Sequence, residues 1–312
     1  MRTTFINTLS ELAAADERIW LLTGDLGFSV LEAFHARFSN RFVNVGVAEQ
    51  NLTGVAAGLA SCGKIVFTYS IANFPTIRCL EQIRNDVCYN ELPVKIVSVG
   101  GGFAYGPQGY THHGLEDLAV MRALPNMTVI APGDPVETEL ATRAVCARPG
   151  PCYLRLGKAR EPVVHRDRPP FAIGQAICLR DGRDVTLIST GGMLAHAMEV
   201  AQQLSREHRV DARVLSMHTL KPLDEDAVYA AARETGGIVT VEEHSVTGGL
   251  GSAVADVLAT MAGARVRFRK FGVPDRLHHQ IGSQTYLRSV CGDLAAAVRE
   301  LLGAAKGSSG EA

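Results

Sequence analysis

Residues 94–100 read VKIVSVG, a short run in which β-branched residues follow one another with little polar interruption. A run of this length and composition is typical of a strand that is buried on both faces of a parallel sheet. Similar runs occur on both sides of it, separated by Ala- and Leu-rich amphipathic segments: RIWLLT (18–23), KIVFTY (64–69), MTVIAP (127–132) and CYLRLG (152–157). The alternation predicts an α/β domain over residues 1–160, in which helices cover both faces of a mostly parallel sheet.

A second series of strand-like runs follows further along the chain: DVTLIST (184–190), RVLSMHT (213–219), GIVTVEEH (237–244) and RVRFRKFGV (265–273). Between the two series, the stretch AREPVVHRDRPPFA (159–172) is rich in proline and charge, which is typical of an exposed linker. We therefore expect two three-layer α/β domains, the second over residues 173–303, joined by a linker at 161–172. The small, polar residues 304–312 are expected to form a disordered tail.

Charge and cysteine content narrow the class of protein. The chain has 31 Lys and Arg against 32 Asp and Glu, and therefore lacks the basic surplus expected of a protein that binds nucleic acid or an anionic membrane. Its seven cysteines form no Cys-x-x-Cys pair and mostly lie in apolar runs, which predicts reduced core thiols in a cytoplasmic protein. No apolar run approaches the roughly 18 residues that a membrane-spanning helix needs. Small molecules and other subunits are the expected partners.

The stretch VGVAEQN (45–51) places Glu49 at the start of a segment built mostly of glycine and alanine, LTGVAAGLAS (52–61). A carboxylate in the first turn could simply cap the helix. Capping does not explain the glycines, which weaken a helix and are usually kept where another backbone packs closely. A carboxylate held in a dry interface is suited to exchanging a proton, so Glu49 is a candidate for acid–base chemistry.

Two later stretches contain further candidates. In YSIANF (69–74), Ile71 and Phe74 lie three residues apart and could form one apolar wall, although ordinary core packing explains them equally well. The glycine-rich stretch VGGGFAYGPQGYTHHGLED (99–117) contains the adjacent His112 and His113 after most of its glycines, and a loop of this kind often carries function. Adjacent histidines without a third ligand at helical spacing make a weak metal site, so no metal ligand is predicted.

Taken in order, these motifs resemble the pyrimidine-binding domain of transketolases. The resemblance lies in GDLGFSV (24–30), RFVNVGVAEQN (41–51), YSIANF (69–74), YGPQGYTHHGLEDLAVMRALPNMTVIAPGDPVE (105–137) and PCYLRLGK (151–158). The second series, together with FGVPDRLHHQIGS (271–283), is similar to the transketolase C-terminal domain. The likeness extends to 1-deoxyxylulose-5-phosphate synthase and, more loosely, to the beta subunits of 2-oxo-acid dehydrogenases.

The resemblance implies roles in binding a coenzyme, thiamine diphosphate. Glu49 would hydrogen-bond a ring nitrogen of its aminopyrimidine and take part in its activation. Ile71 and Phe74 would form the walls against that ring, with Ile71 replacing the usual aromatic residue. Asp25 would lie near the cofactor at a subunit interface, and His112 would contact substrate oxygens during catalysis.

The resemblance also implies a set of substrate-binding residues. Arg2, Ser29 and Lys158 match positions that hold the phosphate of the acceptor, with Lys158 in place of an arginine. Gln108 replaces the acid that contacts a sugar hydroxyl, and Gly100 replaces a histidine. Because these contacts are changed, the resemblance leaves the acceptor, and whether it is phosphorylated, open.

The transketolase domain that binds the diphosphate and Mg²⁺ has no match here. That domain begins with Gly-Asp-Gly and has an Asn about thirty residues later; the nearest strings, GDLGFSV and GDPVETE, lack the Asn. The resemblance therefore implies a separate N-terminal transketolase subunit that carries this site, in an α2β2 heterotetramer.

The leading hypothesis is the C-terminal subunit of a split transketolase, which moves a two-carbon ketol unit from a ketose to an aldehyde or aldose. The alternatives are the beta subunit of a 2-oxo-acid decarboxylating component, or a non-catalytic regulatory subunit of the same fold.

Overall fold

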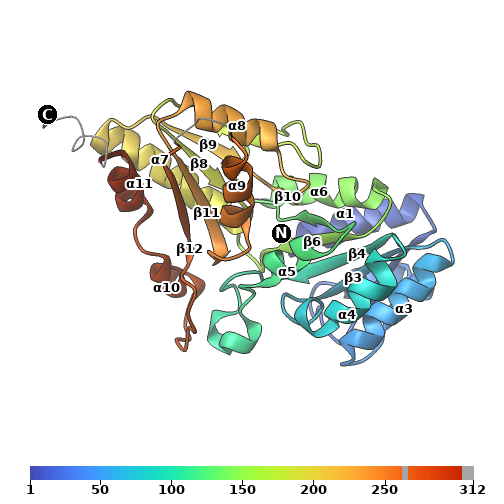
Figure 1. Ribbon diagram of the computed structural model, residues 1–312. Helices are drawn as coiled ribbons and strands as arrows, with labels where there is room; N and C mark the ends of the chain where they lie inside the picture. Colours follow the sequence, from blue (N-terminus) through green and yellow to red (C-terminus); the bar gives the residue numbers. More distant parts are fainter. Residues whose placement is uncertain (262–265, 304–312) are drawn as a thin grey trace, which may run out of the picture.

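The computed structural model describes residues 1–261 and 266–303, which form two α/β units, each built on its own sheet (Figure 1). The first sheet has seven strands in the order β10-β5-β6-β4-β3-β1-β2, all parallel except for the β10–β5 pair. Its strands are β1 (Ile19–Thr23), β2 (Phe42–Asn44), β3 (Ile65–Ile71), β4 (Val94–Val99), β5 (Thr128–Ile130), β6 (Cys152–Leu156) and β10 (Thr219–Lys221).

Helices cover both faces of the first sheet because alternate strand residues point to opposite sides. Phe67 and Val97 pack with the residues of α1 and α6, whereas their neighbours Val66 and Ile96 pack on the other side with α3. Every residue of β4 is buried, as predicted, including the polar Lys95 and Ser98. The helices are α1 (Arg2–Ala15), α2 (Glu32–Arg37), α3 (Glu49–Ser61), α4 (Leu80–Gln82), α5 (Asp117–Ala123) and α6 (Pro135–Ala147).

The second sheet has the order β12-β11-β8-β9-β7, with β7 antiparallel at one edge. Its strands are β7 (Ile177–Arg180), β8 (Val185–Ser189), β9 (Ala212–Ser216), β11 (Ile238–Ser245) and β12 (Phe268–Val273). Helices α7 (Leu194–His208) and α11 (Leu294–Gly303) pack together on one face, and α8 (Glu225–Glu234) and α9 (Leu250–Ala259) pack together on the other. A short helix, α10 (Gln284–Arg288), precedes α11. The predicted fold class, two layered α/β units with mostly parallel sheets, is confirmed.

The two units are joined by a strand that the sequence does not predict. The pattern of RVLSMHT (213–219) predicts a single strand, but β9 ends at Ser216 and the chain then crosses to the first sheet as β10. There Thr219 pairs with Ile130 at the free edge of β5. One apolar cluster also runs through both units and includes Leu52 of α3 and Val254 of α9. The two units therefore share part of their core.

The linker is anchored more firmly than its composition indicates. Residues 166–168 are exposed as expected, but His165 is buried and lies against Asp134, the residue that caps α6. Asp134 accepts hydrogen bonds from the amides of Val164 and His165 at 2.9 and 3.0 Å. Burial acts to raise the pKa of Asp134, but these bonds and the His165 side chain outweigh it and lower the pKa to about 2. The predicted tail at 304–312 lies outside the described residues.

Two sequence-based expectations concern the environment of the protein. No helix in the described ranges is long and apolar enough to cross a membrane. All seven cysteines are free, as expected, and Cys79, Cys88 and Cys152 are buried. The expectation that the thiols lie in the core is wrong for Cys62 and Cys178, which are exposed. Cys62 lies just after the end of α3, and Cys178 lies in β7, an edge strand of the second sheet.

Candidate functional site

Most of the predicted site residues gather at one edge of the first sheet. Because β1, β3 and β4 run parallel, the loops after them emerge side by side at their carboxyl ends, the usual position of a site in such sheets. Asp25 follows β1, Glu49 starts α3 after β2, and Phe74 follows β3. The glycine-rich loop that carries His112 follows β4.

Glu49 is a buried carboxylate with an unexpected partner. Its side chain is 3% exposed, and Oε2 accepts a hydrogen bond from Nη1 of Arg78 at 2.8 Å. The carboxylate therefore pairs with a guanidinium rather than capping α3, whose N-cap residue is Ala48. The central carbon of the same guanidinium lies 4.7 Å from the centroid of the Phe74 ring. Sequence reasoning missed Arg78, because a single arginine in a helical turn carries no motif.

Phe74 and His112 lie next to each other beside this pair. Their ring centroids are 5.1 Å apart and the rings meet edge to face. Both residues are half-buried, and Nδ1 of His112 lies 3.0 Å from Oγ1 of Thr111. Ile71 is the last residue of β3, and its carbonyl accepts a 2.8 Å hydrogen bond from the amide of Phe74. The structure thus brings Glu49, Phe74 and His112 together, with Ile71 at the base of the turn.

Asp25 belongs to a loop that touches the start of α3. Its φ of 60° is unusual for a residue other than glycine, and Asn44 holds the loop by donating to Oδ1 of Asp25 at 3.1 Å. The Asn44 side-chain oxygen also accepts bonds from the amides of Asp25 and Gly46. A Cβ on Gly24 would lie 3.2 Å from the Gly46 carbonyl and 3.8 Å from Cγ of Glu49. The close approach at Gly24 therefore places Asp25 beside the Glu49 turn.

Arg2 and Lys158 converge on a residue that the sequence analysis did not single out, Tyr105. The Lys158 ammonium lies 4.3 Å from the centroid of the Tyr105 ring, a cation–π contact. Burial raises the pKa of the Tyr105 phenol, and the nearby positive charge of Arg2 opposes this effect. Ser29 lies apart on the exposed loop after β1, where its amide donates to Oε1 of Glu32 at 2.7 Å.

Tyr105 also explains why residue 100 is a glycine. Gly100 has φ of 82°, and a Cβ there would lie 2.1 Å from Cε2 of the Tyr105 ring. A histidine cannot be accommodated at this position unless the ring moves, because the ring already fills that space. Gln108, three residues after Tyr105, is exposed, and its backbone amide donates to the Tyr105 carbonyl at 2.9 Å.

The second unit holds the glycine-rich loop in place. The buried Glu243 of β11 accepts from the amide of Phe103 at 2.8 Å and from Arg288 at 2.6 Å. The buried Arg155 of β6 pairs with Asp117 at 2.8 Å and also donates to the carbonyl of Glu243. The sequence revealed no chemical task for residues 173–303, and the structure shows that they fix the position of a loop that carries site residues.

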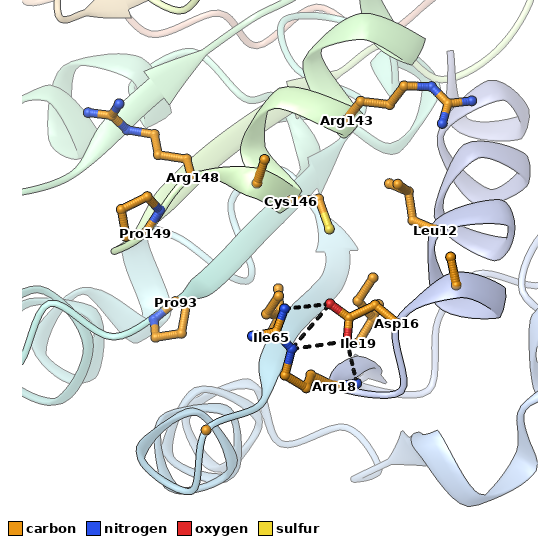
Figure 2. Close-up of a pocket in the computed structure, with 13 residues that line it drawn as sticks. Leu12, Asp16, Arg18, Ile19, Ile65, Pro93, Arg143, Cys146, Arg148 and Pro149 are labelled. Carbon is orange, nitrogen blue, oxygen red and sulfur yellow. Dashed lines mark hydrogen bonds and ion pairs between the residues drawn. The ribbon is translucent and has the colours of Figure 1, made fainter.

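A separate cavity lies at the opposite end of the same strands (Figure 2). It has a volume of about 440 Å³ and lies between α1 and α6, near Ile19 and Ile65, the first residues of β1 and β3. Arg18 and Asp16 form an ion pair of 2.7 Å at its side. None of the sequence-predicted site residues is among those that line it. Elsewhere too, no group of three or more His, Cys, Asp or Glu side chains in the described ranges is placed to hold a metal ion.

The two-unit fold, with its candidate site at the carboxyl ends of the first sheet, is that of one class of proteins, the transketolases. The family described as "Transketolase, pyrimidine binding domain" matches residues 1–162, and "Transketolase, C-terminal domain" matches residues 174–289. The chain belongs to the transketolase family, which confirms the resemblance noted from the sequence.

Several similar proteins are single subunits of about the same length. The chain is 42% identical to one of the apulose-4-phosphate transketolase subunits of Phocaeicola vulgatus, over 88% of this chain and 87% of that one. It is 40% identical to a 6-deoxy-6-sulfo-D-fructose transketolase subunit of Clostridium sp. strain MSTE9, over 94% of this chain and 90% of that one. A solved structure titled as a split gene transketolase, inactive beta4 tetramer, superimposes with a TM-score of 0.86 at 40% identity and covers 97% of each chain.

The likeness also extends to longer enzymes. The chain is 37% identical to 1-deoxy-D-xylulose-5-phosphate synthase 1 of Geobacter sulfurreducens over 97% of its own length, but spans only 48% of that protein.

Proposed function

We propose that this chain is the C-terminal subunit of a two-chain transketolase, which uses thiamine diphosphate to transfer a two-carbon ketol unit from a ketose to an aldehyde or aldose acceptor. The observation that carries the proposal is the buried Glu49 carboxylate, which the Arg78 guanidinium links to the Phe74 ring, itself in contact with the ring of His112. The similar proteins named as transketolase subunits support the reaction class.

The residues fit the aminopyrimidine end of the coenzyme. A buried carboxylate and an aromatic face that both contact one flat guanidinium offer one hydrogen-bonding group and one stacking surface, which is what a flat heteroaromatic ring requires. We assign Glu49 to a ring nitrogen and Ile71 and Phe74 to the walls, with Asp25 at the edge of the site. The bound coenzyme supplies the nucleophilic carbon and the electron sink needed to split a ketose.

In this proposal the chain's own residues move protons and hold the substrate. Glu49 exchanges a proton with the ring nitrogen, a role suited to a carboxylate shielded from water. His112 lies beside Phe74 and contacts the oxygens of the reacting sugar. Arg2 and Lys158 hold an anionic group of the acceptor, while Ser29 and Gln108 contribute polar contacts from their loops. One similar subunit is named for a sugar phosphate and another for a sulfo sugar, and both names support an anionic sugar substrate.

The diphosphate end does not fit this chain alone. We assign Mg²⁺ and the diphosphate to a partner N-terminal subunit in an α2β2 assembly, because transketolases bind them through a Gly-Asp-Gly segment that this sequence does not contain. The outer side of α3 supports such a partner: nothing lies within 4 Å of where a Cβ would stand on Gly54 or Gly58, and Val47, just before the helix, is 77% exposed. The inactive beta4 tetramer of a similar protein agrees with the need for a second chain. The free thiols support a reducing, cytoplasmic location.

Reconstitution tests the proposal directly. This chain and a candidate N-terminal subunit that carries the Gly-Asp-Gly motif are purified separately, then mixed with thiamine diphosphate, Mg²⁺, a ketose donor and an aldose acceptor. We expect ketol transfer only from the mixture. Tight binding of coenzyme and turnover by this chain alone would refute the two-chain assignment. Release of CO₂ from 2-oxo acids would instead indicate the decarboxylating alternative, and coenzyme binding by the mixture without turnover of any kind would indicate a regulatory subunit.

A further inference from the structure

Arg78 occupies a distinctive place in the candidate site. It lies in the 3-10 turn Ile77–Cys79 that follows Phe74, and its guanidinium bridges two residues assigned to the coenzyme ring. One nitrogen donates to Oε2 of Glu49 at 2.8 Å, and the central carbon lies 4.7 Å from the Phe74 ring centroid. The guanidinium is a flat group with N–H donors at its edge, so it makes both kinds of contact that an aminopyrimidine would make.

These two contacts define one position. A ring that hydrogen-bonds Glu49 while it stacks on Phe74 must lie between these two side chains, and the guanidinium of Arg78 already lies there. The coenzyme ring and the guanidinium therefore compete for the same contacts.

The burial of the Glu49 carboxylate explains why it pairs with Arg78. The Glu49 side chain is 3% exposed, and a buried charge without a partner is strongly destabilising. The Arg78 side chain, in contrast, is 49% exposed and therefore has room to rotate outward. Its backbone is fixed, because Cys79 is buried and the hydroxyl of Thr76 donates to the Ala72 carbonyl at 2.7 Å. Rotation of one side chain is enough to open the position.

We propose that Arg78 is a positioning residue that holds the Glu49 carboxylate and covers Phe74, and that the aminopyrimidine ring binds by displacing its guanidinium. This inference rests on the proposed function. It predicts that the protein spends part of the binding energy of the coenzyme on breaking an ion pair and a cation–π contact within its own chain.

Calorimetric titration of thiamine diphosphate, with Mg²⁺ in excess, into the assembled two-chain complex tests this inference. Arg78→Met keeps the length of the side chain and its apolar contact with Phe74 but removes the charge and the donors. We expect this variant to bind the coenzyme about three to thirty times more tightly, the range given by a cation–π contact plus an ion pair whose cation is half-exposed. Arg78→Lys keeps the charge without the flat fork and should fall between the two.

The matched control is Arg84→Met. Arg84 is exposed, lies six residues further on and contacts Asn85 at 2.8 Å, so its replacement should leave the dissociation constant unchanged. Thermal melting of both variants verifies that they fold. Unchanged or weaker binding by Arg78→Met would overturn the inference, because a purely structural role or a direct contact with the coenzyme predicts that result. If the wild-type complex binds no coenzyme, or does not turn over, the proposed function fails first.

Discussion

The two ends of the first sheet offer very different surroundings to a ligand. At the amino ends of the strands lies a cavity of about 440 Å³, and the charged residues at its side, Asp16 and Arg18, satisfy each other (Figure 2). At the carboxyl ends, the hollow beside Asp25 measures only about 120 Å³, yet this end holds the buried carboxylate of Glu49.

The two ends therefore differ in opposite ways, because the end with the larger cavity lacks the buried carboxylate. The carboxyl ends of parallel strands are where loops and helix starts converge, so polar groups from distant parts of the sequence meet there. They are also where the backbone is unusual: Asp25, Ser29 and Gly100 all have positive φ. Four experiments test the contrast between the two ends.

The largest effect is expected at Glu49. Glu49→Gln keeps the size of the side chain but removes its ability to exchange a proton, so turnover by the assembled complex should fall by about 10²–10⁴-fold. The measurement is the rate of ketol transfer, with assembly followed by size-exclusion chromatography. Asp16→Asn, which changes a carboxylate beside the amino-end cavity, should leave the rate within about twofold. Near-normal turnover by the Glu49→Gln complex would contradict the role of Glu49 in proton exchange.

Arg155 should be the most sensitive structural residue near the carboxyl ends. Arg155→Met leaves the carboxylate of Asp117 buried, with the hydroxyl of Tyr153 still bonded to it but no cation beside it. We expect the free energy of unfolding to fall by about 3–5 kcal/mol, measured by urea denaturation. Adding Asp117→Asn should recover part of the loss, because the unpaired charge is then gone. A loss below about 1 kcal/mol would show that the pair does not hold the loop.

Tyr105 should affect the choice of acceptor. Tyr105→Leu removes the ring under the Lys158 ammonium, so KM for an anionic acceptor should rise about three- to tenfold with little change for a neutral aldehyde. Tyr105→Phe keeps the ring and is the control, with KM expected to stay within about twofold. An equal loss with both kinds of acceptor would point to a general distortion of the loop instead.

The smallest effect is expected at the amino-end cavity. Arg143 pairs with Glu11 and Glu139 at its partly exposed rim, so Arg143→Ala should lower the free energy of unfolding by no more than about 1 kcal/mol. Ketol transfer should be unchanged. If activity fell by more than the stability loss explains, the cavity would have a part in function, and the contrast between the two ends would not hold.

Much of the fold follows from local sequence patterns. Strands such as β4 and β6 are buried at every position, and their mostly apolar sequences indicate this, although the burial of Lys95 and Arg155 within them does not follow from the pattern. β10 could not be predicted in this way, because its three residues form a strand only by pairing with β5, about ninety residues away in the chain.

The candidate site likewise has features that the sequence predicts and features that only the structure shows. The burial of Glu49 was inferred from the small residues that follow it, and the structure agrees. Two other features could not be predicted, because they depend on how turns bring side chains together and no residue spacing specifies this. Glu49 pairs with Arg78, and the Tyr105 ring fills the space beside Gly100. The coenzyme and substrate roles of Asp25, Ile71, His112 and Lys158 remain predictions.

The crossing of β10 has a consequence for how the chain is made. Synthesis runs from the N-terminus to the C-terminus, so residues 1–160 leave the ribosome well before Thr219–Lys221 can close the edge of β5. Until then β5 is an open edge, a template for pairing with a neighbouring nascent chain. A fragment of residues 1–160 should therefore self-associate on size-exclusion chromatography, and a monomeric, fully folded fragment would contradict this. Completion of the first sheet is thus delayed until part of the second has been synthesised.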